Sequence, residues 1–593
     1  MIAGAAIPTP GNTQYGASLT MASHTAAHYF LEGLVDLDID YMFSNFGTDH
    51  VSLIEALAEW DRDGRAHPRV VVCPHENVAV HMAGGYAAMT GKGQVVVVHV
   101  DAGTANASMG MHNLFRGRLP VFLMAGKAPF SLHGELTGSR DNYVHFVQDP
   151  YDIANLVRSY VKWEYSLPSG VVAKEVLRRG HTMMQSDPKG PVYLTLPRET
   201  LAEQIDEKAI KAYPAARYGA VASGGADPVV AGRIATKLLG AKNPIAITAY
   251  LGRNPKAVAV LDALTRECGI RVFEFSPIYL NIPRNSPCFG GYDAKSAMAA
   301  ADIGLMLDVD VPWLPKYVPD NPALSWIQVD VDAVKKDFPM WGFPTEERVQ
   351  GDCATVLAQV LEIVRARADA GFRERAASRI AAWAQENAER VARNGAAAAK
   401  PGSVGAITAD YLCAALNAHI SEDDIVVNEA IRNTFPVLNQ MVRTKPETYI
   451  SLAGGGLGFS GGAALGAKLA KPERRVVQVV GDGSYHFSAP TAVYAVAQQY
   501  RLPIFTVVLD NGGWQAVKES VLRVYPDGQA AQADQFHARL AGEHRHFERV
   551  AAAFGAHAEA VQDPAELAAA IKRCIAAVDS GQAAVMSVRI TAL

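Results

Sequence analysis

Two apolar runs, each followed at once by glycines and an oxygen-bearing side chain, mark the segment of this chain best equipped for chemistry. Residues 476–480 lead into Gly-Asp-Gly-Ser at 481–484, and residues 504–509 lead into Asp-Asn-Gly-Gly at 510–513. The runs are typical of buried parallel strands, with a helical pattern between them. Because ligands bind outside the carboxyl ends of strands in an open α/β sheet, the two polar segments are predicted to form one site there.

The oxygens offered by these segments suit a magnesium ion that holds a phosphate. Asp482 supplies a carboxylate, Asn511 an amide oxygen, and the backbone near Gly513 a carbonyl. Mg²⁺ prefers such oxygens and shares them with phosphates, while Gly481 and Gly483 let a phosphate approach the backbone. Each acid or amide alone would be an ordinary turn residue. Their combination across a strand–helix–strand unit predicts a metal and phosphate site.

Helical and strand-like patterns alternate along most of the chain, which predicts an α/β protein with three doubly wound parallel-sheet domains. A length of 593 residues is too great for one hydrophobic core, and a hydrophobic content of 49% suffices for several. The predicted parts are a flexible N-terminal tail at 1–23, a first domain at 24–205, a central domain at 220–385, a linker at 390–405 and a third domain at 406–593.

Charge and composition narrow the functional class. A net charge of −5 and a pI near 6.4 argue against a nucleic-acid partner. The six cysteines are scattered without a CxxC pair, which is typical of reduced thiols in a cytoplasmic protein. We see no apolar run near the ~20 residues of a membrane span, and residues 1–23 lack the features of a signal peptide. A cytoplasmic protein without a membrane partner is therefore predicted.

Two more candidates follow strands in the first domain. Glu76 comes just after the apolar run 70–73 and opens a helical pattern. A buried carboxylate there needs a partner, although an exposed acid at a helix start is the simpler interpretation. His99 lies near the end of the strand that begins at Gln94, and a glycine-containing turn follows at 101–106. A lone histidine is more often a core residue, but its place at the predicted ligand edge makes His99 a candidate proton carrier.

The segment from Gly481 to Asn511 resembles the diphosphate-binding motif of thiamine diphosphate enzymes, in which Gly-Asp-Gly precedes a pair of asparagines. Asp510 replaces the first asparagine of that pair. The resemblance implies thiamine diphosphate and Mg²⁺ as cofactors, a pyrimidine-binding first domain and a diphosphate-binding third domain. The implied metal ligands are Asp482, Asn511 and Gly513, and the implied diphosphate-binding residues are Gly481, Asp482, Gly483, Ser484, Asn511 and Gly513.

Two other segments carry the same resemblance. His-Glu at 75–76, followed by Met-Ala-Gly-Gly-Tyr-Ala at 82–87, is similar to a stretch whose glutamate bonds N1′ of the aminopyrimidine. Glu76 would then act as a general acid and base. Gly-Gly-Leu-Gly-Phe at 455–459 is similar to benzoylformate decarboxylases, which implies that the Gly455 carbonyl accepts the 4′-amino hydrogen and that Leu457 lies under the cofactor.

The likeness to benzoylformate decarboxylases extends to the substrate side. Thr48 matches their active-site serine and His99 their active-site histidine, and a threonine hydroxyl can bind a substrate carboxylate as a serine does. His50, His81 and His112 are predicted to be surface or core residues instead.

The apolar side of the pocket is assigned from the segment after Asn511. Val517 replaces a glutamate of pyruvate decarboxylases, and Trp514 and Leu522 are close in sequence. We therefore expect a substrate with a bulky or apolar group beside its 2-oxo acid.

The central domain differs from that of acetohydroxyacid synthases. In those enzymes a flavin packs beside an arginine-containing turn, whereas the turn at 308–313 has no arginine. FAD is therefore not predicted, and Asp308 and Asp310 are expected in a solvated turn.

The chain is thus suspected to belong to the benzoylformate decarboxylase and acetolactate synthase (pyruvate oxidase–decarboxylase) family. The resemblance implies thiamine diphosphate- and Mg²⁺-dependent decarboxylation of a 2-oxo acid, carboligation of the resulting enamine to a second carbonyl, or both. It also implies a homodimer or homotetramer, because in the family the glutamate and the diphosphate site come from different chains.

A dehydrogenase is the alternative. Gly456, Gly458 and Gly461 fit GxGxxG, and Asp482 lies where a ribose-binding acid would. This alternative would bind a nicotinamide or flavin nucleotide, and it gives no role to Asn511.

Overall fold

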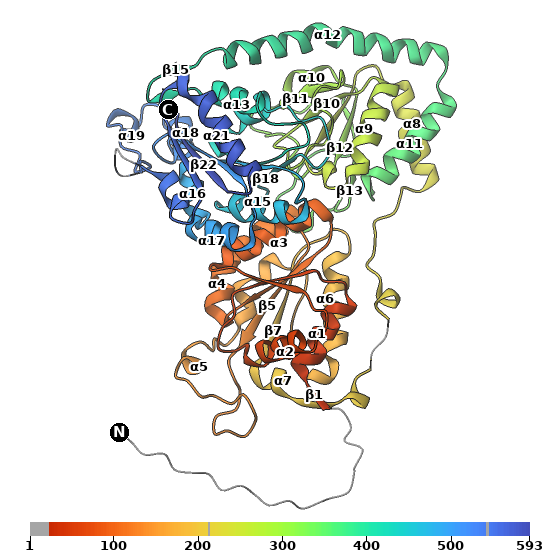
Figure 1. Ribbon diagram of the computed structural model, residues 1–593. Coiled ribbons are helices and arrows are strands. Elements are labelled where there is room, and N and C mark those ends of the chain that lie inside the picture. Colours follow the sequence, from red (N-terminus) through yellow and green to blue (C-terminus); the bar gives the residue numbers. More distant parts are fainter. Residues whose placement is uncertain (1–22, 212–213, 541, 543–544, 593) are drawn as a thin grey trace, which may run out of the picture.

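The computed structural model describes residues 23–211, 214–540, 542 and 545–592, so the predicted tail at 1–23 lies outside it except for Ser23 (Figure 1). Three six-stranded sheets carry the fold, and every strand pairing within them is parallel. This confirms the predicted α/β class. The sheets define an N-terminal unit (41–197), a central unit (244–350) and a C-terminal unit (425–589).

The N-terminal unit has the strand order β3-β2-β4-β5-β7-β6. Its strands are β2 (Tyr41–Ser44), β3 (Arg69–Val72), β4 (Gln94–Val98), β5 (Val121–Lys127), β6 (Glu164–Ser166) and β7 (Val192–Pro197). Its helices are α1 (Ala26–Asp36), α2 (Val51–Arg62), α3 (Glu76–Thr90), α4 (Val100–Gly117), α5 (Val144–Val147), α6 (Ala173–Gln185) and α7 (Arg198–Ala202). A separate pair joins β1 (Ser23–Thr25) to β8 (Gln204–Asp206).

The central unit has the order β11-β10-β9-β12-β13-β14. Its strands are β9 (Pro244–Thr248), β10 (Arg271–Glu274), β11 (Phe289–Gly291), β12 (Ile303–Leu307), β13 (Ser325–Asp330) and β14 (Glu347–Gln350). Its helices are α8 (Pro228–Gly240), α9 (Pro255–Cys268), α10 (Lys295–Ala300) and α11 (Cys353–Arg367).

The C-terminal unit has the order β18-β17-β19-β20-β22-β21. Its strands are β17 (Ile425–Glu429), β18 (Tyr449–Ser451), β19 (Val476–Gly481), β20 (Phe505–Asp510), β21 (His557–Val561) and β22 (Ala584–Arg589). Its helices are α13 (Ala409–Asn417), α14 (Thr434–Gln440), α15 (Phe459–Ala470), α16 (Asp482–Phe487), α17 (Pro490–Tyr500), α18 (Gln515–Val524), α19 (Gln529–Gln532), α20 (Phe547–Ala552) and α21 (Leu567–Asp579).

The predicted linker at 390–405 is largely helical. Helix α12 (Ala370–Ala398) runs for 29 residues and lies along the top of Figure 1, between the central and C-terminal units. Its alanines favour the helix, so the alanine-rich part of the stretch continues it rather than ending it. The β15 (Gly402–Ser403) and β16 (Ala406–Ile407) pair follows. None of the helices in the described parts of the chain is long and apolar enough to cross a membrane.

Helices α3 and α15 cross at very short range and join the N-terminal and C-terminal units (Figure 1). A Cβ on Gly85 would lie 2.2 Å from the backbone oxygen of Ala463, and one on Gly466 would lie 2.0 Å from the oxygen of Met82. Only glycine fits at these two positions, because a side chain would force the backbones apart. The crossing places the N-terminal ends of both helices, and hence the segments before them, against the opposite unit.

The expectation of a solvated turn at Asp308 and Asp310 is wrong. Both carboxylates are buried where the central unit meets α4. Arg118, which ends α4, donates to Asp310 at 2.6 Å, and the Lys335 ammonium donates to the same carboxylate at 2.7 Å. Arg253 lies 3.3 Å from Asp308. Paired charges can be buried where single ones cannot, and Arg118 is contributed by another unit that the sequence order does not place nearby.

Candidate active site

The structure brings the two predicted metal-binding segments together. Strands β19 and β20 are neighbours, with Gly481 opposite Leu509. One Asp482 oxygen accepts from the amide of Gly513 at 2.9 Å, and the Asn511 side-chain oxygen accepts from the same amide at 3.3 Å. Both side-chain oxygens therefore lie around a single nitrogen at the carboxyl end of the sheet.

The surroundings of Asp482 suit a hard cation. Its carboxylate is 2% exposed, and burial, with the nearby Asp510 charge, raises its pKa to about 7. A divalent cation would favour the ionised form. Gly483 lies under Trp514, where a Cβ would come within 2.5 Å of the indole nitrogen, and Gly513 has a φ of 148°. The chemistry of the donor set, a carboxylate with an amide oxygen, fits Mg²⁺.

Asp510, the acid in place of an asparagine, is neutralised by two arginines. Arg545 Nε lies 3.0 Å from one oxygen and Arg589 Nη1 lies 3.1 Å from the other. Arg589 is the register partner of Asp510 on β22. Sequence reasoning missed both arginines, because Arg589 reaches Asp510 through strand pairing and Arg545 through a loop, and neither contact leaves a local signal.

Glu76 is the first residue of α3 and is 7% exposed. The side-chain amide of Asn45 donates to one of its oxygens at 2.9 Å, and that of Asn106 donates to the other at 3.1 Å. The partners that a buried carboxylate requires are therefore present and neutral. They hold the carboxylate without a competing positive charge.

The loop at 454–458 is bound by side chains of the N-terminal unit. Asn77 donates to the carbonyl of Gly458 at 3.2 Å, and Asn113 donates to that of Gly456 at 2.8 Å. His112 Nε2 lies 2.6 Å from the carbonyl oxygen of Gly454 and contacts the loop, a role that its sequence context did not indicate. Because Asn77 is next to Glu76, the predicted pyrimidine acid and the predicted aminopyrimidine loop meet within one chain in this structure, whereas the resemblance implied that the glutamate and the diphosphate site come from different chains.

A buried acid fixes the end of this loop. Glu429, at the end of β17, is 1% exposed and accepts from the backbone amides of Gly458 at 2.6 Å and Ser460 at 2.8 Å. Burial raises its pKa to about 7. Gly458 has a φ of 95°, and a Cβ there would lie 2.2 Å from the oxygen of Phe487. The sequence showed Glu429 after a strand but offered no partner for it.

His99 and Thr48 lie in one region of the N-terminal unit. His99 precedes α4, and its Nδ1 contacts the carboxylate of Asp49, the residue after Thr48. The Thr48 hydroxyl is exposed and lies 3.4 Å from Nε2 of His145. His50 and His81 are buried, and burial lowers the pKa of His81 to about 4.

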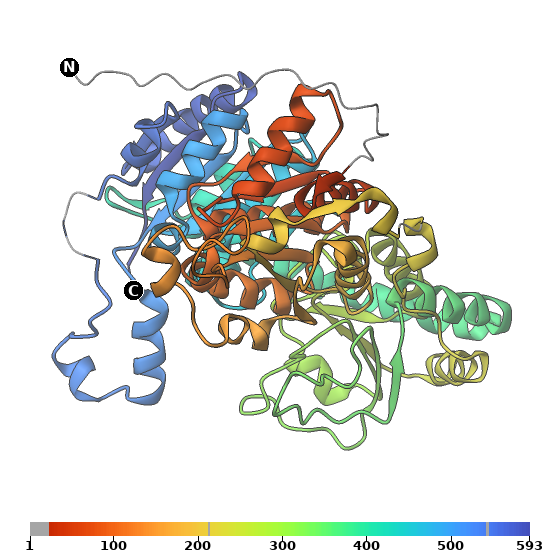
Figure 2. The same cartoon turned by 90° about the horizontal axis from the view of Figure 1, so that it is seen from below.

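A cavity of about 630 Å³ borders the 454–458 loop where the central and C-terminal units meet α4. Aromatic and aliphatic side chains dominate its wall, and polar groups stand at intervals. Its lining includes Arg116, Tyr250, Phe275, Ile278, Glu429, Phe435, Leu452 and Gly455. Val517, predicted to form the apolar side of the site, does not line it. Val517 lies on an exposed face of α18 with Val524, next to Tyr525 just beyond the helix. The segment of α18 and α19 projects from the body in Figure 2.

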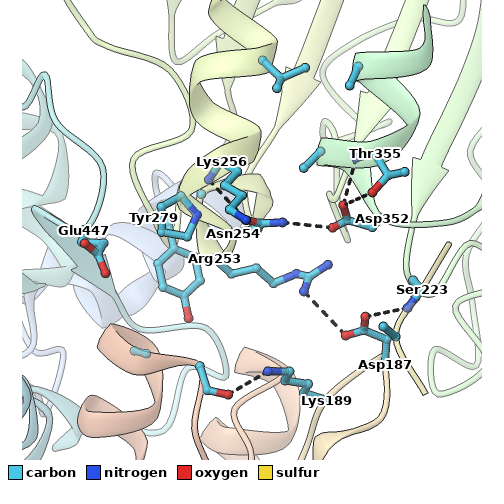
Figure 3. A pocket seen from close by; sticks show the side chains of 18 of the residues that line it. Asp187, Lys189, Ser223, Arg253, Asn254, Lys256, Tyr279, Asp352, Thr355 and Glu447 are labelled. Atoms are coloured by element: carbon cyan, nitrogen blue, oxygen red, sulfur yellow. Dashed lines mark hydrogen bonds and ion pairs between the residues drawn. The ribbon is translucent and has the colours of Figure 1, made fainter. Parts of the chain in front are cut away.

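A second cavity, of about 880 Å³, lies where the three units meet and holds none of the predicted site residues (Figure 3). The helices α9 and α11 begin at its wall. Their first turns are already capped, because Asn254 accepts from the Lys256 amide and Asp352 accepts from the Thr355 amide. Arg253 crosses the space toward Asp187. One amide at each helix start is thus already bound by its cap, and because the cavity also holds none of the predicted site residues, we do not place the active site there.

Comparison with known proteins finds cofactor-binding domains in the N-terminal and C-terminal units. Residues 24–156 match the family described as thiamine pyrophosphate enzyme, N-terminal TPP binding domain, and residues 434–588 match the corresponding C-terminal TPP binding domain. Benzoylformate decarboxylase of Pseudomonas aeruginosa is 25% identical over 76% of this chain and 80% of its own length. The acetolactate synthase large subunit of Haemophilus influenzae is 25% identical over 84% of each. The solved thiamine diphosphate-dependent 4-hydroxybenzoylformate decarboxylase of Rhodococcus jostii RHA1 superposes with a TM-score of 0.76 at 20% identity, covering 96% of this chain and all of that one.

The chain therefore carries the N-terminal and C-terminal cofactor-binding domains of thiamine pyrophosphate enzymes, and its relatives include a benzoylformate decarboxylase and an acetolactate synthase. The dehydrogenase alternative is not favoured. Gly456 and Gly458 hold their loop against Asn113 and Glu429, and a Cβ on Gly461 would lie 2.8 Å from the side chain of Val493.

Proposed function

We propose that this protein is a thiamine diphosphate- and Mg²⁺-dependent decarboxylase of a 2-oxo acid with a bulky apolar substituent. One observation carries the proposal: the buried Glu76 and the loop at 454–458 meet at the start of α3, while Asp482 and Asn511 share an amide at a strand end of the same chain. These are the groups needed at the two ends of such a cofactor.

The residues have separate tasks in this proposal. Asp482, Asn511 and the Gly513 carbonyl hold Mg²⁺, and residues 481–484 receive the diphosphate. Glu76 holds and returns a proton at the pyrimidine ring nitrogen, with its carboxylate fixed by two amides. The bound cofactor supplies the electron sink for loss of carbon dioxide.

The remaining assignments concern the pyrimidine end and the substrate. The Gly455 carbonyl accepts from the pyrimidine amino group, and Leu457 supports the ring. A volume of about 630 Å³ beside Gly455 falls in the range of small-molecule sites, and its aromatic wall supports a bulky apolar substituent. His99 and Thr48, which do not line this cavity, are the candidate polar contacts of the substrate carboxylate and carbonyl.

A screen of 2-oxo acids tests the proposal. Aryl, branched and short-chain 2-oxo acids are offered with thiamine diphosphate and Mg²⁺, each with and without an acceptor aldehyde, while carbon dioxide and carbon products are measured. We expect the highest kcat/KM for a bulky apolar substrate and an aldehyde product. Ligated product as the main outcome would make the protein a synthase instead. No turnover of any 2-oxo acid by cofactor-loaded enzyme would contradict the proposal.

Assembly and compartment complete the proposal. Large apolar side chains are exposed around α5 and on α18, which supports burial against a second copy in a homodimer or homotetramer; they include Tyr143, Phe146, Val147, Tyr151, Val517 and Tyr525. Sedimentation at assay concentration should show no active monomer. The six cysteines are buried and free, which supports work in the reducing cytoplasm on a small-molecule substrate.

A further inference from the structure

His99 is held at both ring nitrogens by groups that only accept hydrogen bonds. Its Nδ1 contacts Oδ1 of Asp49, and its Nε2 lies 2.8 Å from the side-chain oxygen of Gln148. A carboxylate has no proton to donate, and an amide oxygen likewise only accepts. With a proton on each nitrogen, as an imidazolium cation, the ring would donate a hydrogen bond to both acceptors.

Two glycines, Gly47 and Gly126, leave the space in which Asp49 and His99 come into contact. Asp49 is 1% exposed, and its second oxygen lies 3.4 Å from the backbone amide of Val100. A Cβ on Gly126 would lie 1.2 Å from that oxygen, and a Cβ on Gly47 would lie 2.0 Å from Nδ1 of His99. Two glycines thus leave the space that the pair occupies, so the contact is built into the fold.

No other described cation competes for the Asp49 carboxylate. His50 Nδ1 lies 3.4 Å from it, but this nitrogen accepts from the Gly47 amide and so carries no proton. Burial lowers the pKa of His50 and keeps it neutral. Burial alone would raise the pKa of Asp49, yet the hydrogen bond from His99 holds it below its ordinary value.

The other charged or titratable groups around His99 are few. Asp101 follows it on α4, and His145 faces Thr48 from α5. The hydrogen bond to Asp49 is the main reason that the pKa of His99 is raised. Arg140 and Arg198 act on His145, where they and burial lower its pKa.

We propose that Asp49 is a positioning residue that keeps His99 a double hydrogen-bond donor and aims its Nε2–H at the place now taken by the Gln148 oxygen. In the working enzyme an oxygen of the anionic 2-oxo acid takes that place. The inference rests on the proposed function, because it takes a 2-oxo acid as the substrate. A charged donor strengthens such a hydrogen bond roughly twofold over a neutral one.

Gln148 is suited to give way to the substrate. Arg140 holds the segment around it through the His145 carbonyl, the Phe146 ring and Asp149, so a rotation of the Gln148 side chain alone would free the His99 Nε2. Asp49, in contrast, is buried on the sheet side of the ring and stays in place. The two partners of His99 therefore have different tasks, one permanent and one exchangeable.

Side-chain NMR of histidine-labelled, full-length protein tests the inference. The His99 signal is assigned by its loss in His99→Gln, and its titration is followed in the wild type, Asp49→Asn and two controls. Asp101→Asn removes a neighbouring charge, and Gln148→Ala removes the exchangeable partner. We expect the wild-type pKa above 6.5 and a fall of about one pH unit or more in Asp49→Asn, with smaller changes in the controls.

A neutral wild-type His99 at pH 6.5 overturns the inference even if Asp49→Asn fails to fold, and so does an unchanged titration in that variant. The kinetic readout is the pH profile of kcat/KM on the best 2-oxo acid. Because the cation is the active form, its basic limb should move to lower pH in Asp49→Asn, and an unmoved limb contradicts the positioning role. If the titration shifts as expected but no 2-oxo acid is turned over, the proposed function fails while the Asp49–His99 pairing stands.

Discussion

The C-terminal and central units both place carboxylates at strand ends, yet these acids have opposite surroundings. In the central unit Asp310 is bound by Arg118 and Lys335, cations that the chain itself supplies. In the C-terminal unit Asp482 is bound by backbone amides and faces another acid. Only the second carboxylate needs a cation from outside. A strand-end acid therefore indicates a metal site only where the protein has not already neutralised it.

Strand order also distinguishes the central unit from the N-terminal and C-terminal units. Counted within each unit, the two outer sheets both run 2-1-3-4-6-5, whereas the central sheet runs 3-2-1-4-5-6, the order of dinucleotide-binding folds. The predicted cofactor residues lie on the outer pair. In the central unit, the edge where a nucleotide would bind in such folds holds the Arg118–Asp310–Lys335 cluster. The two units that carry the predicted cofactor residues therefore share a strand order, which the central unit lacks although it is also an α/β unit with a parallel sheet.

The largest effect is expected when the carboxylate of the predicted metal site, Asp482, is removed. Asp482→Ala should abolish Mg²⁺-dependent retention of thiamine diphosphate, because the diphosphate charge is then held without its cation. Calorimetric titration of cofactor with and without Mg²⁺ measures this loss. Asp310→Asn is the matched control: it should lower the free energy of unfolding, because it leaves buried cations short of a partner, but keep cofactor affinity. Equal affinity in Asp482→Ala and the wild type would remove the metal assignment.

The next effect concerns Glu76, the buried carboxylate bound by two neutral amides. Glu76→Gln should fold and bind cofactor, since one of Asn45 and Asn106 still donates to the amide oxygen and the other can turn its own oxygen toward the amide nitrogen. Exchange of the cofactor C2 proton should nevertheless slow by ~10²–10⁴-fold. Exchange followed by NMR in deuterated buffer measures it. A wild-type exchange rate would give Glu76 a purely structural role.

A smaller effect depends on pH and on Glu429. Its folded pKa of about 7 exceeds the ordinary 4.5, so its contribution to stability is fully present below pH 4.5 and is lost as pH rises through 7. The unfolding free energy of Glu429→Gln, measured in urea without cofactor, should therefore fall less over this range than that of the wild type. Parallel pH dependences in the two proteins would mean that Glu429 is ionised in the fold at all these pH values.

The smallest effect is expected at the substituted position of the motif. Asp510→Asn should leave Mg²⁺ affinity unchanged, because Asn511 remains the ligand and Asp510 is turned toward Arg545 and Arg589. Mg²⁺ titration of cofactor binding provides the measurement. A marked loss of Mg²⁺ affinity would identify Asp510 as a direct ligand and weaken the contrast between the two units.

Sequence patterns predicted what is encoded locally. The runs at 476–480 and 504–509 became β19 and β20 within a residue, because buried parallel strands need continuous apolar residues. The same reasoning placed Glu76 at the start of a helix. Patterns of this kind fail where the partner is distant. Arg589 meets Asp510 only through strand pairing, and Glu429 meets Gly458 only because a backbone turn brings two amides to it.

The structure also changed two local interpretations, one through a tertiary contact and one through helix propensity. Asp308 and Asp310 looked solvated because their turn lacks a cation, and the cation came from Arg118. The alanines near residue 396 looked like a linker because alanine-, glycine- and proline-containing stretches often are. In α12 the alanines extend a helix instead, since alanine has the best helix propensity.

Helix α4 limits the replacement of the central unit by that of a relative. Its 18 residues span about 27 Å, and His99 comes directly before its first turn. Near its other end Asn113 donates to the 454–458 loop, and Arg118 donates to Asp310 of the central unit. A central unit taken from a relative without the matching carboxylates would leave Arg118 a buried cation without a counter-charge. The strain would fall on the same helix that carries His99. The central unit is therefore not an interchangeable module, and chimeras of this enzyme should keep α4 and its aspartates together.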